Sequence, residues 1–194
     1  MIVGHSFGGF VALETGHYYG GELGGILFMD FTVAPPEQAN EWGLRVAREG
    51  VQPGRRLRVY PTKEEALGRF RLLPEQPGVH PALLQHMAEY GLREAPGGWT
   101  WKFDTSVFDS DFGVTDRIVY QAEAIVAAPG RKAVVYGQDS KLFDDDSAAY
   151  LREKGAVDMP IIGIPGARHH LMLDEPIAFA SVLRSLVAQW HLAP

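Results

Sequence analysis

The spacing of glycine and serine near the start of the chain constrains the fold most. Residues 4–8 read Gly-His-Ser-Phe-Gly. This Gly-x-Ser-x-Gly spacing fits a sharp turn that joins a strand to a helix and lifts the serine hydroxyl out of the fold. The backbone at such a serine is strained, and side chains at Gly4 and Gly8 are expected to clash with the neighbouring strand and helix. The motif therefore predicts that Ser6 is a nucleophile.

The residues on both sides of the motif fit the same turn. Met1-Ile2-Val3 reads as the end of a buried strand. Residues 7–19 carry apolar side chains at helical spacing directly after the serine. Strand, turn and helix therefore follow one another in the required order.

Residues 4–9, Gly-His-Ser-Phe-Gly-Gly, resemble the nucleophile turn of the alpha/beta-hydrolase superfamily, which often reads Gly-His-Ser-x-Gly-Gly. In that family four more strands precede the strand before the serine. The resemblance therefore implies the C-terminal part of a hydrolase domain, either from a truncated reading frame or as a separate fragment. The family's oxyanion hole takes one backbone N–H from the residue after the serine, here Phe7, and a second from an earlier loop. Because this second donor has no counterpart in the sequence, weak activity is expected.

The rest of the chain alternates between apolar runs and helical patterns, which predicts an α/β fold with right-handed crossovers in a parallel sheet. With the resemblance, the expected fold is a partial alpha/beta-hydrolase fold with about four parallel strands, flanking helices and a helical cap insertion. Residues 1–33 and 113–194 are expected to form the core and residues 34–112 the cap. Further strands are predicted at residues 24–29, 132–136 and 159–164, and further helices at 114–128, 144–154 and 176–191.

The expected cap is rich in helix signals and aromatic side chains. Thr62-Lys63-Glu64-Glu65 reads as a capping box, and Pro81 stands near the first turn of another helix. Trp101 belongs to a run of aromatic residues in this segment. In the resembled family the cap covers the active site, so Trp101 is expected to help bind an apolar acyl group.

Composition disfavours several classes of function. The formal net charge is -6, with 24 acidic and 18 scattered basic residues, so neither nucleic acid nor an anionic membrane is an expected partner. Cysteine is absent, which rules out a thiol nucleophile. The sequence carries no signal peptide before the serine motif and no apolar run of about 20 residues that could cross a bilayer. A cytoplasmic protein is therefore the expectation.

The expected base is a histidine near the C-terminus. Residues 165–169, Pro-Gly-Ala-Arg-His, resemble the family's Pro-Gly-Ala-Gly-His loop, with Arg168 in place of the last glycine. His169 is therefore assigned as the base, with its Nε2 within about 3.5 Å of Ser6 Oγ. His170 and His5 are assigned, with Trp101, to substrate binding. No metal site is expected, because no carboxylate cluster flanks the two adjacent histidines at ligand spacing.

Two aspartates compete for the role of the triad acid, which precedes the histidine in the chain order of this fold. Many family members carry it at the fourth position of Gly-x-x-Asp after the third strand of this chain, but residues 137–140 read Gly-Gln-Asp-Ser. Asp139 therefore stands one residue early, which rotates its side chain away. A subgroup uses the residue after the preceding strand, where Asp30 stands. Asp30 is preferred, and Asp139 stays the alternative.

The sequence thus predicts a serine hydrolase that needs no cofactor and acts on a small ester, lactone or thioester. The competing hypothesis is a noncatalytic hydrolase fragment or association module in which the triad residues are relics. Because the first strand is expected to lack a neighbour on one side, self-association or pairing with the missing N-terminal half is also expected.

Overall fold

The computed structural model describes residues 1–38, 57–104 and 120–192. The chain divides into two compact units. The core unit comprises Met1–Glu41 and Thr115–Pro194, and the insertion unit comprises Trp42–Val114. Each unit is described by itself below.

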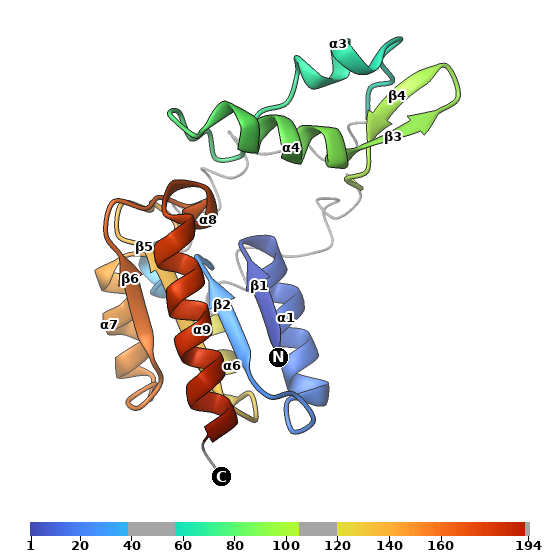
Figure 1. The fold of residues 1–194 in the computed structure, drawn as a ribbon. Coiled ribbons are helices and arrows are strands. Elements are labelled where there is room, and N and C mark those ends of the chain that lie inside the picture. The colour runs from blue at the N-terminus through green and yellow to red at the C-terminus, as the bar shows by residue number, and fades with distance from the viewer. Residues whose placement is uncertain (39–56, 105–119, 193–194) are drawn as a thin grey trace. The chain divides into compact units, whose positions relative to one another are not determined.

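The core unit is built on a parallel four-stranded sheet (Figure 1). The strand order is β1-β2-β5-β6, so the sheet crosses from one strand to the next through helices, as the alternating pattern predicts. The expected fold class is confirmed. The strands are β1 (Ile2–His5), β2 (Ile26–Met29), β5 (Lys132–Gly137) and β6 (Ile161–Ile164).

Helices cover both faces of this sheet, which is why β2 is buried along its whole length. On one face, Phe28 and Val134 pack with residues of α1, α6 and α7. On the other face, Leu27 and Val135 pack against α9. The helices are α1 (Phe7–Tyr19), α6 (Gln121–Ala127), α7 (Asp145–Glu153), α8 (Leu171–Asp174) and α9 (Pro176–Leu192).

The predicted helix boundaries of the core unit have clear local causes. The Asp144 side chain accepts a hydrogen bond from the Ser147 backbone N–H and so caps the start of α7. Pro176 is the first residue of α9, where its missing N–H costs no helical hydrogen bond. The helix expected over residues 114–128 is described from Gln121 onward, and residues 114–119 lie outside the described part of the chain.

Within its described residues, 57–104, the insertion unit contains two helices and an antiparallel hairpin. They are α3 (Lys63–Leu67), α4 (Pro81–Gly91), β3 (Leu92–Ala95) and β4 (Gly98–Trp101). Thr62 caps α3 by accepting from the Glu65 N–H, as the capping box predicts. Besides the expected helices the insertion contains this hairpin, whose turn is possible because Gly97 and Gly98 both have positive φ.

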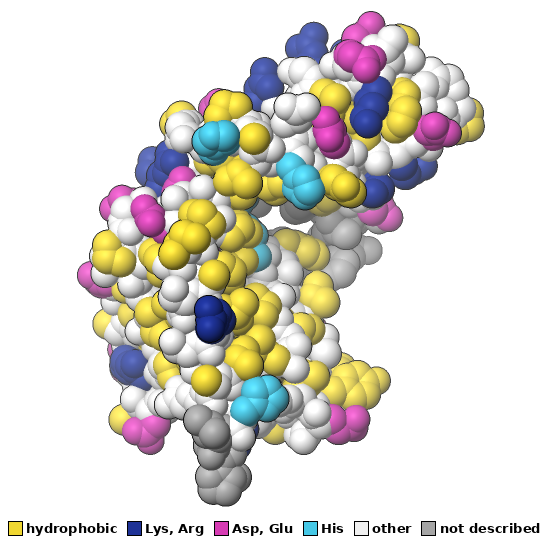
Figure 2. Space-filling model, viewed as in Figure 1, with side chains coloured by type: hydrophobic (Ala, Val, Ile, Leu, Met, Phe, Trp, Pro, Cys, Tyr) yellow, Lys and Arg dark blue, Asp and Glu magenta, His cyan; other side chains and the backbone are white. Residues whose placement is uncertain are grey.

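Strand β1 lies at the edge of the sheet within the described residues. Val3 pairs with Leu27 and its side chain therefore points to the face that carries α9, yet the residue is 38% exposed. Figure 2, which shows this side of the core unit, has hydrophobic side chains gathered beside α9. An open edge next to exposed apolar side chains favours pairing with another strand.

We therefore predict that the chain self-associates through β1 and that Val3→Lys weakens this association. A lysine on an edge strand opposes pairing with a second strand. Light scattering at micromolar concentration should give an apparent mass above that of one chain for the wild type and a lower one for the variant. Val157→Lys is the matched control, because Val157 is exposed in the loop between α7 and β6. A monodisperse wild-type monomer would contradict the prediction.

Candidate active site

Ser6 lies at the turn between β1 and α1 with a strained backbone. Its φ is 52°, a conformation that L side chains rarely adopt. Gly4 permits the turn, because a Cβ there would lie 2.3 Å from the carbonyl oxygen of Gly8. The expected clash at Gly8 is wrong, since among the described residues a Cβ there would meet no atom within 4 Å apart from its chain neighbours and the backbone of its own helix. Gly9 has the second close contact instead, against the ring of Phe31.

Asp30 directly follows β2 and is completely buried. Its φ is 45°, so a second strained residue stands beside Ser6 at the carboxyl ends of neighbouring strands. Three donors satisfy its carboxylate: His169 Nδ1 at 2.8 Å, Ser140 Oγ at 2.6 Å and the Gly137 backbone N–H at 2.9 Å. A buried carboxylate needs such partners because burial removes its hydration.

Ser140 occupies the position where the pattern of the resembled family carries the acid. Its hydroxyl oxygen accepts from the Leu142 backbone N–H at 3.1 Å. The hydroxyl proton is therefore directed to Oδ1 of Asp30, the same oxygen that His169 contacts. The serine in the usual acid position thus holds the carboxylate that comes from the neighbouring strand.

Asp139, the alternative acid, has an exposed side chain. Its backbone N–H donates to the carbonyl oxygen of Ala167 at 2.9 Å, which ties the loop after β5 to the loop that carries His169. The structure brings Asp30, and not Asp139, to His169 Nδ1. The one-residue shift relative to the family pattern accounts for the difference.

The loop before His169 is fixed from two sides. A Cβ at Gly137 would lie 2.3 Å from the carbonyl oxygen of Ala167, so only glycine allows this close approach. The Arg168 guanidinium makes a bidentate contact with Asp174, Nε to Oδ2 at 3.0 Å and Nη2 to Oδ1 at 2.7 Å. The Arg168 backbone N–H also donates to Asp174 Oδ2. These bonds set the position of the next residue, His169.

The other ring nitrogen of His169, Nε2, is buried and has no hydrogen-bond partner among the described residues. The hydrogen bond expected from the Ser6 hydroxyl to this nitrogen is therefore not formed in this structure. Catalytic hydrogen bonds are often long or poorly aligned without substrate and shorten in the complex. Because Nδ1 contacts a carboxylate and donates to it, Nε2 carries the lone pair of the neutral ring.

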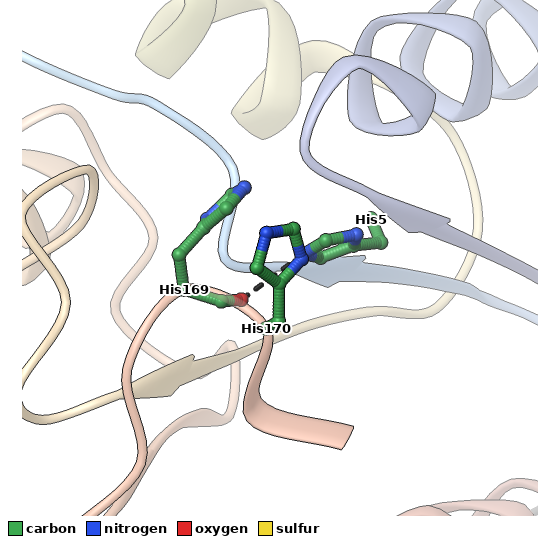
Figure 3. Close-up of side chains that lie close together, drawn as sticks. All are labelled: His5, His169 and His170. Atoms are coloured by element: carbon green, nitrogen blue, oxygen red, sulfur yellow. Dashed lines mark hydrogen bonds between the residues drawn. The ribbon is translucent and has the colours of Figure 1, made fainter. Parts of the chain in front are cut away.

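His5 connects the end of β1 to the loop that carries His169. Its Nε2 donates to the carbonyl oxygen of His169 at 3.0 Å (Figure 3). Burial is the largest cause that lowers the pKa of His5 to about 4, and the nearby His169 ring lowers it further. His5 is therefore neutral at neutral pH. Its hydrogen bond keeps the backbone of His169 beside the end of β1, directly before Ser6.

The remaining predicted site residues are placed as follows. Phe7 is the first residue of α1, so its backbone N–H stands at a helix N-terminus, where the helix dipole favours a negative charge. His170 is buried, and its ring centroid lies 4.8 Å from that of His169. Trp101 is the last residue of β4 in the insertion unit, and its role in substrate binding stays a prediction.

Sequence reasoning missed three features of this site. The role of Ser140 has a signal in the sequence, because a hydroxyl in the usual acid position can donate to a carboxylate on the neighbouring strand. The contact of Gly9 with Phe31 has no local signal, because it joins residues from different elements. The Arg168–Asp174 pair has none either, because it forms in a turn without a regular sequence pattern.

No helix in the described segments is long and apolar enough to span a membrane. Among curated protein sequences, none matches this chain. Solved structures are similar in fold: E-2-(acetamidomethylene)succinate hydrolase (TM-score 0.71, 18% identity, 96% of this chain and 65% of that one) and an esterase from Mycobacterium tuberculosis (0.70, 19%, 97% and 60%). A thioesterase domain from the curacin biosynthetic pathway is also similar (0.64, 17%, 97% and 66%).

The chain therefore spans between 60% and 66% of the length of these three structures. The sequence model described as the alpha/beta hydrolase family matches residues 1–182. The strained turn at Ser6 and the parallel sheet agree with this match. The chain belongs to the alpha/beta hydrolase family.

Proposed function

We propose that this chain carries the catalytic residues of a serine hydrolase that acts on an ester, lactone or thioester. The observation that carries the proposal is the buried hydrogen bond between Asp30 and His169 Nδ1. It leaves a lone pair on Nε2 of a ring whose centroid lies 4.6 Å from that of His5, the last residue of β1 before Ser6. A hydroxyl nucleophile, an imidazole base and an orienting carboxylate are the parts that acyl transfer to water requires.

In the first half-reaction, Ser6 Oγ attacks the carbonyl carbon of the substrate, and Nε2 of His169 takes the hydroxyl proton. Asp30 holds the proton on Nδ1 and so stabilises the imidazolium that forms. The Phe7 N–H donates to the oxyanion of the tetrahedral intermediate. The intermediate collapses when the bond to the alcohol or thiol breaks, and the leaving group takes the proton from Nε2.

In the second half-reaction, water replaces the alcohol or thiol. His169 Nε2 takes a proton from the water as its oxygen attacks the acyl carbon. The bond to Ser6 Oγ then breaks, and the serine recovers the proton from the imidazolium. No cofactor takes part in either half-reaction.

The chemistry of the side chains favours a neutral or apolar acyl group. The imidazole of His5 lies beside that of His169 and is held in the neutral form by burial, so it offers no fixed charge that would select a charged acyl group. The solved structures that resemble the chain include an esterase and a thioesterase domain, which agrees with an ester or thioester as the bond that is cleaved. The fold itself supports many reactions and does not select one ester.

We predict that a fluorophosphonate probe labels the chain at Ser6. The probe reacts covalently with an activated serine hydroxyl, so labelling tests activation without requiring turnover of a substrate. Ser6→Ala should abolish the label, whereas Ser181→Ala, at an exposed serine of α9, should retain it. Mass spectrometry of the peptide identifies the site. An unlabelled wild-type chain would favour the noncatalytic alternative.

We also predict that Asp30→Asn slows this labelling by roughly 10⁴-fold, as the loss of the aspartate does in a serine-protease triad. The neutral amide does not stabilise the imidazolium as the carboxylate does, and its NH2 group can donate to Nδ1 and so favour the wrong tautomer of the ring. Asp139→Asn is the matched control and should change the rate little, because its side chain is exposed. A mild Asp30→Asn effect beside a severe Asp139→Asn effect would reverse the assignment.

Ser140→Ala is expected to destabilise the fold by about 1–3 kcal/mol. The substitution removes one donor from the buried carboxylate of Asp30 and leaves the Leu142 N–H without its acceptor. Denaturant unfolding measures the change in the free energy of unfolding. Ser185→Ala, at an exposed serine of α9, should change it by less than about 0.5 kcal/mol. Equal values for the two variants would show that the Ser140–Asp30 bond contributes little.

A further inference from the structure

Three imidazoles converge where the loop after β6 meets the end of β1. They belong to His5, His169 and His170 (Figure 3). One nitrogen from each ring lies within 4.8 Å of the other two. The ring centroids are 4.6 Å apart for His5 and His169, 5.3 Å for His5 and His170 and 4.8 Å for His169 and His170. Among the described residues this is the one group of at least three histidine, aspartate or glutamate side chains that could hold a metal ion.

The hydrogen bonds around the cluster resemble those around a metal ion. A histidine that binds a metal through one nitrogen usually donates its other N–H to a carboxylate or a backbone carbonyl, which fixes the tautomer and the ring orientation. His169 has such a carboxylate in Asp30 at Nδ1. His5 has such a carbonyl, because its Nε2 donates to the backbone oxygen of His169. Two of the three rings thus already have the outer partners of a metal ligand.

The buried Nε2 of His169 supplies a second, independent observation. It carries a lone pair, and no described residue donates to it. A buried acceptor without a partner costs free energy, and coordination of a cation would recover part of this cost. His5 offers a lone pair on Nδ1 while its hydrogen bond is kept, and on Nε2 once that bond is broken.

We propose that His5, His169 and His170 form a binding site for a divalent transition metal, with Zn²⁺ and Cu²⁺ as the ions that suit imidazole nitrogen. Three histidines leave a fourth tetrahedral position for water. With metal–nitrogen bonds of about 2.0–2.1 Å, the nitrogens of a tetrahedral site lie roughly 3.3 Å apart. The rings must therefore close by small rotations, and the site binds more weakly than a structural zinc site.

The metal inhibits acyl transfer, because it occupies the same Nε2 lone pair that accepts the proton of Ser6. This second part of the inference rests on the proposed function, whereas metal binding itself does not. The site is thus a means of blocking the base and not a cofactor site.

The binding test is a calorimetric titration of the metal-free chain with Zn²⁺. One equivalent should bind to the wild type, and His170→Gln should weaken binding by at least about tenfold. The chain has seven histidines, so a control variant carries His17→Gln, His86→Gln and His191→Gln together and should bind as the wild type does. Circular dichroism checks that each variant folds, and His5→Gln provides a second ligand variant. Unchanged affinity in both ligand variants, or its loss in the control variant, overturns the site.

A spectroscopic measurement identifies the ligands directly. Cu²⁺ bound to the wild type should show electron paramagnetic resonance splitting from three nitrogens, and His170→Gln should lose one of them. A spectrum with oxygen ligands alone overturns the assignment.

The inhibition test follows the fluorophosphonate labelling of Ser6. Zn²⁺ should slow labelling of the wild type, and a chelator should restore it; in His170→Gln the slowing should need at least about tenfold more metal. If Zn²⁺ binds but does not slow the labelling of Ser6, the proposed inhibition is wrong and the proposed metal site is still supported. A chain that binds Zn²⁺ but is never labelled refutes the proposed function and leaves the metal site supported. The two failures are therefore distinguishable.

Discussion

The carboxylate of Asp30 is the interaction on which the site depends. Its burial requires three donors from two segments: His169 from the loop after β6, and the Ser140 hydroxyl and the Gly137 backbone N–H from the end of β5 and the loop that follows it. Removing any donor leaves the buried carboxylate with fewer hydrogen bonds, which costs free energy. This cost opposes any separation of the segments that carry the donors. The position of His169 follows from this, since one of the three bonds is the bond that orients its ring.

Much of this site could be predicted from the sequence because its signals are local. The turn at Ser6 is encoded within five residues, and the histidine loop within another five. Asp30 required a step of elimination, since Ser140 fills the usual acid position and Asp139 stands one residue early. The part of the prediction that depended on which side chains pack together in space was less accurate. Gly8 has open space where a clash was expected, and Gly9 contacts the Phe31 ring, which no sequence pattern places there.

The insertion illustrates the same limit at the level of whole elements. Thr62 marks the start of a helix, because its side chain forms the capping hydrogen bond. The hairpin of β3 and β4 depends instead on pairing between strands and on a close approach of Gly98 to the Tyr60 carbonyl oxygen, which would lie 2.0 Å from a Cβ there. Local sequence predicts the helix and permits the hairpin turn, whereas the contact of the hairpin with Tyr60, which is distant in the sequence, has no local signal.

The place of the acid follows from the geometry of adjacent parallel strands. Strands β2 and β5 are hydrogen-bonded neighbours, so their carboxyl ends lie about one strand spacing apart, roughly 4.8 Å. A carboxylate at the end of either strand can therefore reach the same imidazole with a modest change in side-chain direction. In this chain the end of β2 supplies the carboxylate and the end of β5 supplies a hydroxyl that donates to it. The pair of strand ends, rather than one sequence position, determines how the histidine is held, which is why a serine in the usual acid position does not argue against a triad.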